Sequence, residues 1–202
     1  MSLRLALASR WTPRRALLVM LDRVATSTIA TLDDLLEKHS PGALDAIRMA
    51  ETAPVGNIEA RRAAMASAHN ARVAALVAAL GREKAIMTGR EALFPVGEKL
   101  GEEARERLGV GGGMQELERA ARVLYRSLGI HFTIERQKDG SMLMRVYRCA
   151  LADHYSAEAC EVLSAADEGV VRGLAPRRRM RFYKRMTCGH PVCLALISED
   201  DR

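Results

Sequence analysis

The chain has 202 residues, of which 49% are hydrophobic, 28% charged and 4% aromatic, and its formal net charge is +6. This composition indicates a globular protein with a sizeable core and excludes a disordered chain. Few aromatics and abundant Ala, Leu, Met and Arg favour helices over an all-β sandwich. The basic excess suggests a small anionic partner. Nucleic acid is not expected, because few aromatics are available for stacking and no nucleic-acid-binding signature is present.

No apolar run approaches the roughly eighteen residues that a helix needs to cross a bilayer. The longest run near the start covers residues 16–21, and Asp22 and Arg23 end it. No clean export signal accompanies it. We therefore expect a cytoplasmic protein without a membrane span, whose cysteines stay reduced.

Helical periodicity dominates the first half of the chain. Pro13 suits a first helical turn, Gly129 suits a helix end, and Pro95 is expected to bend the helix that contains it. Breaks are predicted at residues 40–42 and 53–57, with a hinge at 110–113. The predicted helices cover residues 13–38, 44–48, 58–80, 91–108 and 117–128.

Strand and turn signals follow Gly129. Asp139-Gly140 is a strong hairpin signal between two strand-like runs, and Ser156 suits a helix cap. The predicted strands cover residues 130–136, 142–148, 180–186 and 192–197, with a helix over 156–174. The sequence thus predicts an α+β fold, with a helical N-terminal half followed by a ββαββ antiparallel-sheet domain.

The same pattern suggests two regions. Residues 1–84 form a helical region whose leucine stripes need burial, so we expect them to contact a second copy in a homodimer or a partner subunit. Residues 85–202 form the α+β domain.

All four cysteines lie between Cys149 and Cys193, in the last quarter of the chain. Brought together by the sheet and its helix, they could hold zinc or an iron–sulfur cluster. His190, inside the last cysteine turn, could join them or act as an acid–base group. The alternative is that free cysteines pack as small hydrophobic residues or act as reactive thiols. The predicted metal ligands are Cys149, Cys160, Cys188 and Cys193.

The predicted helix over 156–174 places Cys160, Ser164 and Asp167 on one face, at i, i+4 and i+7. A thiol, a hydroxyl and a carboxylate on one face could line a pocket, with Asp167 as general base. The alternative is a half-exposed polar edge. The predicted catalytic residues are Asp167, Cys149 and Ser164.

A basic row follows this helix, in a stretch from Gly169 to Ser198 that has no acidic residue. Strand alternation predicts Arg179, Arg181 and Arg185 on one face. Guanidinium groups bind carboxylates bidentately, so this row could hold an anionic substrate; the alternative is a solvated basic strand.

The C-terminal residues resemble a known family. Cys149, residues 163–169, residues 173–176 and residues 187–193 are similar to the L-2-amino-thiazoline-4-carboxylic acid hydrolase-like family. The resemblance covers roughly residues 85–197. It implies an α+β fold and hydrolytic opening of a small sulfur-containing ring acid. Cys149, Asp167 and Cys193 stand at the family's recurrent cysteine, aspartate and final cysteine, whereas Ser164 replaces another cysteine.

The chain also resembles the related 4-vinyl reductase (V4R) small-molecule-binding domain. Gly97-x-x-x-Gly101 would then fall in an early helix. This resemblance implies a bound small molecule and, in some members, a zinc held by cysteines and a glutamate. Cys160 and Cys193 fit two of those positions, while Phe182 and Arg185 replace the glutamate and a cysteine.

Two functions follow from the sequence. The first is a small-molecule- or metal-binding V4R/hydrolase-like protein that hydrolyses a small cyclic amide or thiazoline-type acid. The second is a non-enzymatic accessory subunit of a larger complex that carries zinc or an iron–sulfur cluster. The sequence leaves both open.

Overall fold

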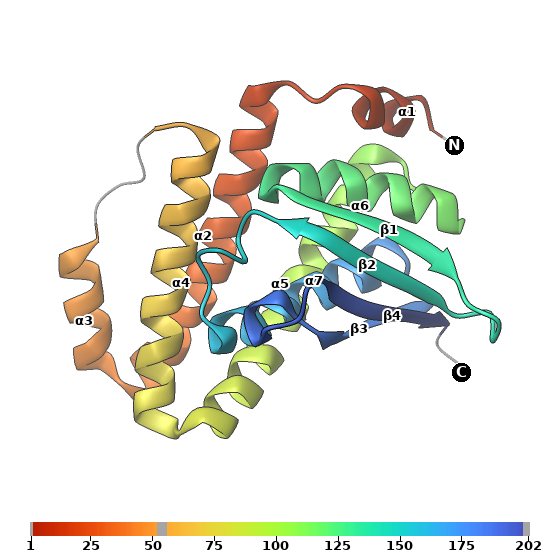
Figure 1. Ribbon diagram of the computed structural model, residues 1–202. Coiled ribbons are helices and arrows are strands. Elements are labelled where there is room, and N and C mark those ends of the chain that lie inside the picture. Colours follow the sequence, from red (N-terminus) through yellow and green to blue (C-terminus); the bar gives the residue numbers. More distant parts are fainter. Residues whose placement is uncertain (1, 52–55, 200–202) are drawn as a thin grey trace.

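The computed structural model describes residues 2–51 and 56–199. Within them, the helices α1 to α6 come first along the chain, and four strands follow that form one sheet (Figure 1). Helix α7 lies between the second and third strands in chain order. The helices are α1 (Leu3–Arg10), α2 (Arg14–His39), α3 (Pro41–Ala50), α4 (Ile58–Leu80), α5 (Arg82–Leu108), α6 (Met114–Leu128) and α7 (Ala157–Leu174). The strands are β1 (Ile130–Arg136), β2 (Met142–Cys149), β3 (Arg178–Lys184) and β4 (Cys193–Glu199), with a 3-10 turn η1 (Met186–Cys188).

The predicted helices are largely confirmed, with two clear differences, the first being helix α1, which the sequence did not predict. Helix α5 begins at Arg82, directly after Gly81, whereas the sequence placed its start at Glu91. The apolar spacing continues through Ala85 and Ile86, which are buried, so packing extends the helix at its N-terminal end. The predicted break at 53–57 falls partly outside the described residues, which stop at 51 and resume at 56.

The strands form an antiparallel sheet in the order β1-β2-β4-β3, which confirms the α+β class and the ββαββ order. The hairpin between β1 and β2 turns at Asp139-Gly140 as predicted. Gly140 has φ 85°, a backbone conformation that residues with a Cβ rarely adopt. Asp139 stabilises the turn by accepting hydrogen bonds from the Ser141 backbone and hydroxyl. Figure 1 shows α5 and α7 crossing behind the sheet.

Helices α5 and α7 lie in backbone contact because glycines face each other along them. A Cβ built on Gly97 would lie 1.9 Å from the Ala166 carbonyl oxygen, and one on Gly169 would lie 2.1 Å from the Phe94 carbonyl oxygen. Gly97-x-x-x-Gly101 therefore falls in a helix, as expected, and lets α7 approach closely. This approach fixes the position of α7 and of the side chains it carries.

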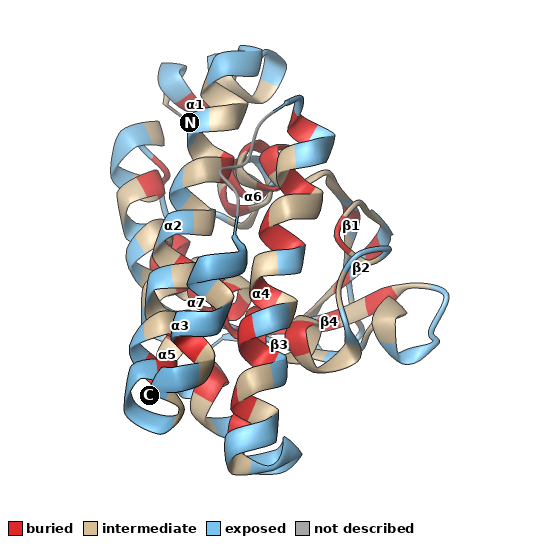
Figure 2. Ribbon diagram, turned by 90° about the vertical axis from the view of Figure 1, so that its left-hand side faces the viewer, coloured by how far each residue is buried: buried red, intermediate tan, exposed pale blue. Residues whose placement is uncertain are grey.

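Hydrophobic clusters connect the two predicted regions. One cluster packs α6 and α7 against the sheet, and another joins Leu32 and Val73 of the first region to Leu93 and Val162 of the second. Figure 2 shows buried positions along α4 and α6, while α1 and α3 are largely exposed. The second cluster thus crosses the predicted boundary between residues 84 and 85, which stays a prediction.

Helix α4 is the one helix in the described ranges that is long and apolar enough to cross a membrane by length and composition alone. It packs against α2, α5 and α7 and buries Arg62, His69 and Arg72. Arg72 pairs with Asp33 and Glu51. Buried, partnered polar groups of this kind are consistent with a core helix of a folded domain.

Candidate functional site

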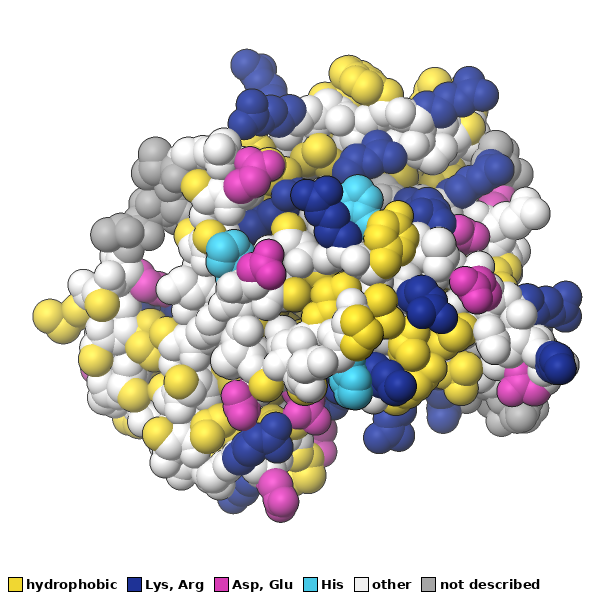
Figure 3. Space-filling view, in the orientation of Figure 1, with side chains coloured by type: hydrophobic (Ala, Val, Ile, Leu, Met, Phe, Trp, Pro, Cys, Tyr) yellow, Lys and Arg dark blue, Asp and Glu magenta, His cyan; other side chains and the backbone are white. Residues whose placement is uncertain are grey.

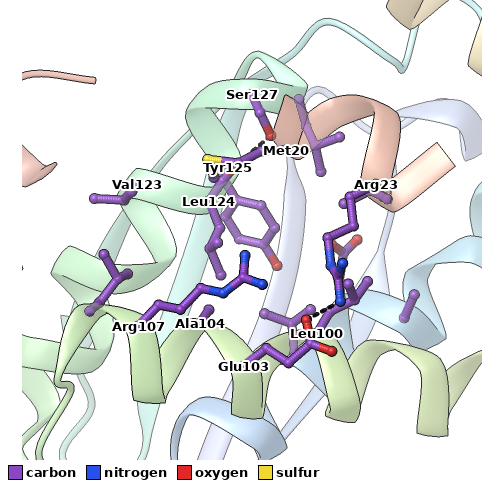
Figure 4. Close-up of a pocket in the computed structure, with 16 residues that line it drawn as sticks. Met20, Arg23, Leu100, Glu103, Ala104, Arg107, Val123, Leu124, Tyr125 and Ser127 are labelled. Carbon is purple, nitrogen blue, oxygen red and sulfur yellow. Dashed lines mark hydrogen bonds and ion pairs between the residues drawn. The ribbon is translucent and has the colours of Figure 1, made fainter. Parts of the chain in front are cut away.

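A cavity of about 210 Å³ lies between α2, α5, α6 and α7 (Figure 4). An apolar cavity of about 150 Å³ is enough to admit benzene, so this space suits one small ring. Its walls are mostly aliphatic, and its polar groups come from separate helices. The lining includes Met20, Arg23 and Val24; Leu100, Glu103, Ala104, Arg107 and Leu108; Leu124, Tyr125 and Leu128; and Ala166, Asp167 and Val170.

Asp167 brings a titratable carboxyl to this cavity from α7. Burial raises the pKa of Asp167 from 3.8 to about 7, with a smaller lowering contribution from Tyr125 and a raising one from the Glu168 charge. Desolvation disfavours the ionised carboxylate, which explains the direction. Asp167 is therefore close to half ionised at neutral pH, as an acid–base catalyst needs.

Tyr125 places a phenol beside this carboxyl from α6. Its ring packs edge-to-face on Phe132, with centroids 5.6 Å apart. Its buried hydroxyl influences Asp167 but makes no hydrogen bond of normal geometry with any described residue. Burial and then the Asp167 charge hold the pKa of Tyr125 well above its usual value, so the hydroxyl keeps its proton. It is a buried, protonated donor that lies close enough to Asp167 to favour the ionised carboxylate.

Arginines lie on the α2 and α5 walls of the cavity. Arg23 pairs with Glu103 there. Arg107 makes no ion pair within the described ranges, and Figure 4 shows its side chain reaching toward Tyr125. The cavity therefore combines a carboxyl, a phenol and a guanidinium among aliphatic walls.

Three of the four cysteines lie close enough to Asp167 for its charge to act on them. Burial, and to a lesser extent that charge, raises the pKa of Cys149 to about 12 and of Cys160 to about 11, and raises the pKa of Cys193. These thiols are protonated at neutral pH. Cys188 is exposed on η1, where its charge contributes to the raised pKa of Cys193.

The fit to a metal can be judged from the donors. In the part of the chain that the structure describes, no group of three or more His, Cys, Asp or Glu side chains is placed to hold one ion. Cys193 Sγ instead accepts a hydrogen bond from the Met186 backbone N–H at 3.3 Å. The arrangement does not fit a zinc or iron–sulfur centre, and such a cofactor stays a prediction that metal analysis would test.

Ser164 lies at a buried junction. Its hydroxyl accepts hydrogen bonds from Arg90 and Arg185, each at 3.0 Å, and donates to the Glu161 carbonyl at 2.8 Å. A hydroxyl has one proton and two lone pairs, so these contacts use its full capacity. Ser164 is held as a structural link between α5, α7 and the chain after β3.

The predicted row of arginines is wrong at Arg185. Strand β3 ends at Lys184, and an irregularity in its pairing with β4 lies between Phe182 and Lys184. The alternation therefore breaks, and Arg185 turns inward to Ser164. Arg179 and Arg181 are exposed, as alternation predicts, but neither lines the cavity. His190 is exposed beside Cys188.

Sequence reasoning missed the groups that come from other helices. Tyr125 of α6 is buried and Arg107 of α5 is exposed at the edge of the cavity, and neither residue belongs to a pattern that the sequence singled out. Glu168 was also missed: it is buried, pairs with Arg90 at 2.7 Å and accepts from the Phe182 N–H. The one available signal was the Asp167-Glu168 pair in the middle of α7, among the small and apolar residues from Ala165 to Val171.

The fold and sequence can be compared with known proteins. A trafficking protein particle complex subunit 3 from Naegleria fowleri, covalently bound to palmitic acid, aligns with TM-score 0.57 and 11% identity over 69% of this chain and 95% of that chain. The phenol-responsive sensory domain of the transcription activator PoxR, with phenol, aligns with TM-score 0.50 and 18% identity over 73% of this chain and 76% of that chain. At such identities these likenesses show the fold alone.

Sequence comparison is more specific. A comparison with curated proteins finds no match. The family model of L-2-amino-thiazoline-4-carboxylic acid hydrolase matches residues 61–195, which run from the first turn of α4 into β4 and include Asp167. The match extends beyond half of the chain, and this protein therefore belongs to the L-2-amino-thiazoline-4-carboxylic acid hydrolase family.

Proposed function

We propose that this protein hydrolyses a small ring acid of the aminothiazoline carboxylate type in the cavity between α2, α5, α6 and α7. The observation that carries the proposal is Asp167, a half-buried carboxyl with a pKa of about 7 that opens on a cavity sized for one ring. Membership of the family supports the substrate class.

The polar groups of the cavity match the two ends of such a molecule. The amino and ring-nitrogen end is amidine-like, and a carboxylate pairs with such a group when it is protonated. The acid end needs a cation, and Arg107 is the one we assign, in place of Arg179 and Arg181, which do not line the cavity. Tyr125 has a buried hydroxyl to donate.

The proposed reaction adds one water to the ring. The ionised Asp167 accepts a proton from water while the water oxygen bonds to the ring C=N carbon. The bond from that carbon to one ring heteroatom then breaks, and Asp167 returns the proton to the leaving atom. No covalent step is assigned to Cys149 or Cys193, because burial holds both thiols protonated.

A second candidate is binding without turnover. The mostly aliphatic walls favour an apolar small molecule. One of the two similar structures is covalently bound to palmitic acid, and the other contains phenol. In that case the cavity would bind a small apolar ring, and Asp167 would donate or accept one hydrogen bond to it.

The decisive experiment measures loss of 2-aminothiazoline-4-carboxylate by chromatography, which detects ring opening whichever bond breaks. We expect Asp167→Asn to lower kcat at least about 100-fold, because general acid–base catalysis contributes that much. In the unmodified protein kcat/KM should fall about tenfold per pH unit below pH 7, because protonation of Asp167 removes the base.

The matched control is Asp153→Asn, which changes an exposed loop carboxylate and should leave the rate unchanged. Arg107→Gln should raise KM more than it lowers kcat. Saturable binding of phenol without hydrolysis of the ring acid would contradict the proposal and favour the second candidate.

A further inference from the structure

Helix α1 turns an apolar stripe toward solvent. Trp11 directly follows the end of α1 at Arg10 with an extended backbone, and the exposed fractions of Leu3, Leu7 and Trp11 are 76%, 60% and 72%; within the helix, Leu3 and Leu7 are spaced at i and i+4. Side chains at this spacing share one side of a helix. Large apolar groups gathered on one exposed face mark an interaction surface more often than isolated ones do.

The opposite side of α1 holds the helix in place. Leu5 is fully buried in the cluster beneath it. Arg126 of α6 donates hydrogen bonds to the Ser9 carbonyl at 2.9 Å and to the Thr12 hydroxyl at 3.2 Å. The Ser2 side chain accepts from the Leu5 N–H and so caps the helix. The stripe is therefore presented on a docked helix and not on a loose end.

The surroundings of this stripe are uniformly basic in sequence. Residues 1–21 contain four arginines and no acidic residue, the first carboxylate being that of Asp22. All four side chains are exposed: Arg4, Arg10, Arg14 and Arg15. Figure 3 shows hydrophobic side chains at the top of the molecule, over α1, with Lys and Arg side chains around them.

We propose that this face, formed by Leu3, Leu7 and Trp11 with the four surrounding arginines, binds the surface of an anionic lipid bilayer. Apolar side chains enter the headgroup boundary while nearby basic residues meet the lipid phosphates, and tryptophan favours this interface. A second copy of the chain fits less well, because two such faces would bring together eight arginines from a segment, residues 1–21, that carries no carboxylate of its own. The protein would lie on the membrane without spanning it.

Trp11 is the only tryptophan in the chain, so its fluorescence reports on this face alone. Vesicles of phosphatidylcholine containing phosphatidylglycerol should shift its emission to shorter wavelength and should sediment the protein. Vesicles of phosphatidylcholine alone should do neither. Added salt should weaken the response, because screening reduces attraction between exposed charges.

Two variants separate the apolar and basic contributions. Leu3→Ser with Leu7→Ser should abolish the shift, and Arg14→Gln with Arg15→Gln should lower vesicle affinity roughly tenfold or more. The matched control is Met49→Ser, which changes a side chain 89% exposed on α3 and should bind like the unmodified protein. All these side chains are exposed, so the variants should fold, which circular dichroism checks.

An emission unchanged by anionic vesicles, with the protein left in the supernatant, would overturn the proposal. A shift that follows protein concentration in the absence of lipid would also overturn it and identify a second copy as the occupant. An equal loss of binding in Met49→Ser would show that α1 is not the surface.

Discussion

At the scale of single residues, burial decides the chemistry of this protein. The pKa of Asp167 rises to about 7 chiefly because its carboxylate loses water. The same cause keeps the Cys149 and Cys160 thiols protonated. Burial thus disfavours the nucleophilic form of these thiols and brings the pKa of Asp167, our proposed acid–base group, close to neutral pH.

Ionisation of Asp167 should also lower the free energy of unfolding as pH rises. The folded carboxyl has a higher pKa than the unfolded one, so between about pH 4 and pH 7 the folded state holds more protons. The free energy of unfolding therefore falls with rising pH in this window. Asp167→Asn removes the penalty and should be more stable at pH 8 by as much as about 4 kcal/mol, with little difference near pH 4.

Urea unfolding of both proteins across this pH range measures the difference. Asp153→Asn, at an exposed position, serves as the control and should follow the unmodified protein. A difference between Asp167→Asn and the unmodified protein that stays constant from pH 4 to pH 8 would contradict a raised pKa.

At the scale of elements, the contact between α5 and α7 places the acidic residues. Gly97 and Gly169 allow the two backbones to touch, so α7 carries Asp167 to the cavity and Glu168 to Arg90 of α5. The sheet then covers the opposite face of α7. A wider separation of these helices would open the cavity wall that both contribute.

Gly97→Ala should lower the free energy of unfolding by about 3 kcal/mol, because its methyl would meet the Ala166 carbonyl oxygen and the helices must separate. Gly42→Ala in α3 is the matched control. A Cβ at position 42 would meet no atom within 4 Å, so this variant should raise the free energy of unfolding by about 0.5 kcal/mol through helix propensity. Thermal or urea unfolding compares the two, and equal effects would contradict backbone contact.

At the scale of the whole molecule, Arg62 ties the N-terminal helices to the second half. Its guanidinium donates to the Ser127 and Arg126 carbonyls, both at 2.9 Å, at the end of α6. A cation is favourable there because helix C-termini carry partial negative charge. The link joins α4 to α6 in a position that hydrophobic packing alone does not specify.

Arg62→Leu should lower the free energy of unfolding by about 2 to 3 kcal/mol, because the Ser127 and Arg126 carbonyls lose a charged donor. The neighbouring Arg61→Leu removes an ion pair with the partly exposed Asp22 and should cost less than about 1 kcal/mol. Chemical unfolding of both variants measures the contrast. A larger loss in Arg61→Leu would show that the link to α6 is not the stronger one.

The sequence predicted much of this architecture because local chemistry specifies it. Leucine spacing predicted α2, the alanine-rich stretch predicted α4, Asp139-Gly140 predicted the hairpin, and Ser156 predicted the cap of α7. Errors arose where packing overrides local pattern. Helix α5 starts nine residues earlier than predicted, at Arg82 and not Glu91, and a strand irregularity turns Arg185 inward.

The amino-acid sequence by itself determined the order of helices and strands and the family resemblance, and it placed Asp167 on one helix face with Cys160 and Ser164, since each rests on local patterns along the chain. Only the tertiary structure decided which groups face Asp167. Tyr125, Arg107 and Arg23 come from three other helices, and their convergence depends on how those helices pack. The same packing sets desolvation, and desolvation sets the pKa on which the proposed chemistry depends.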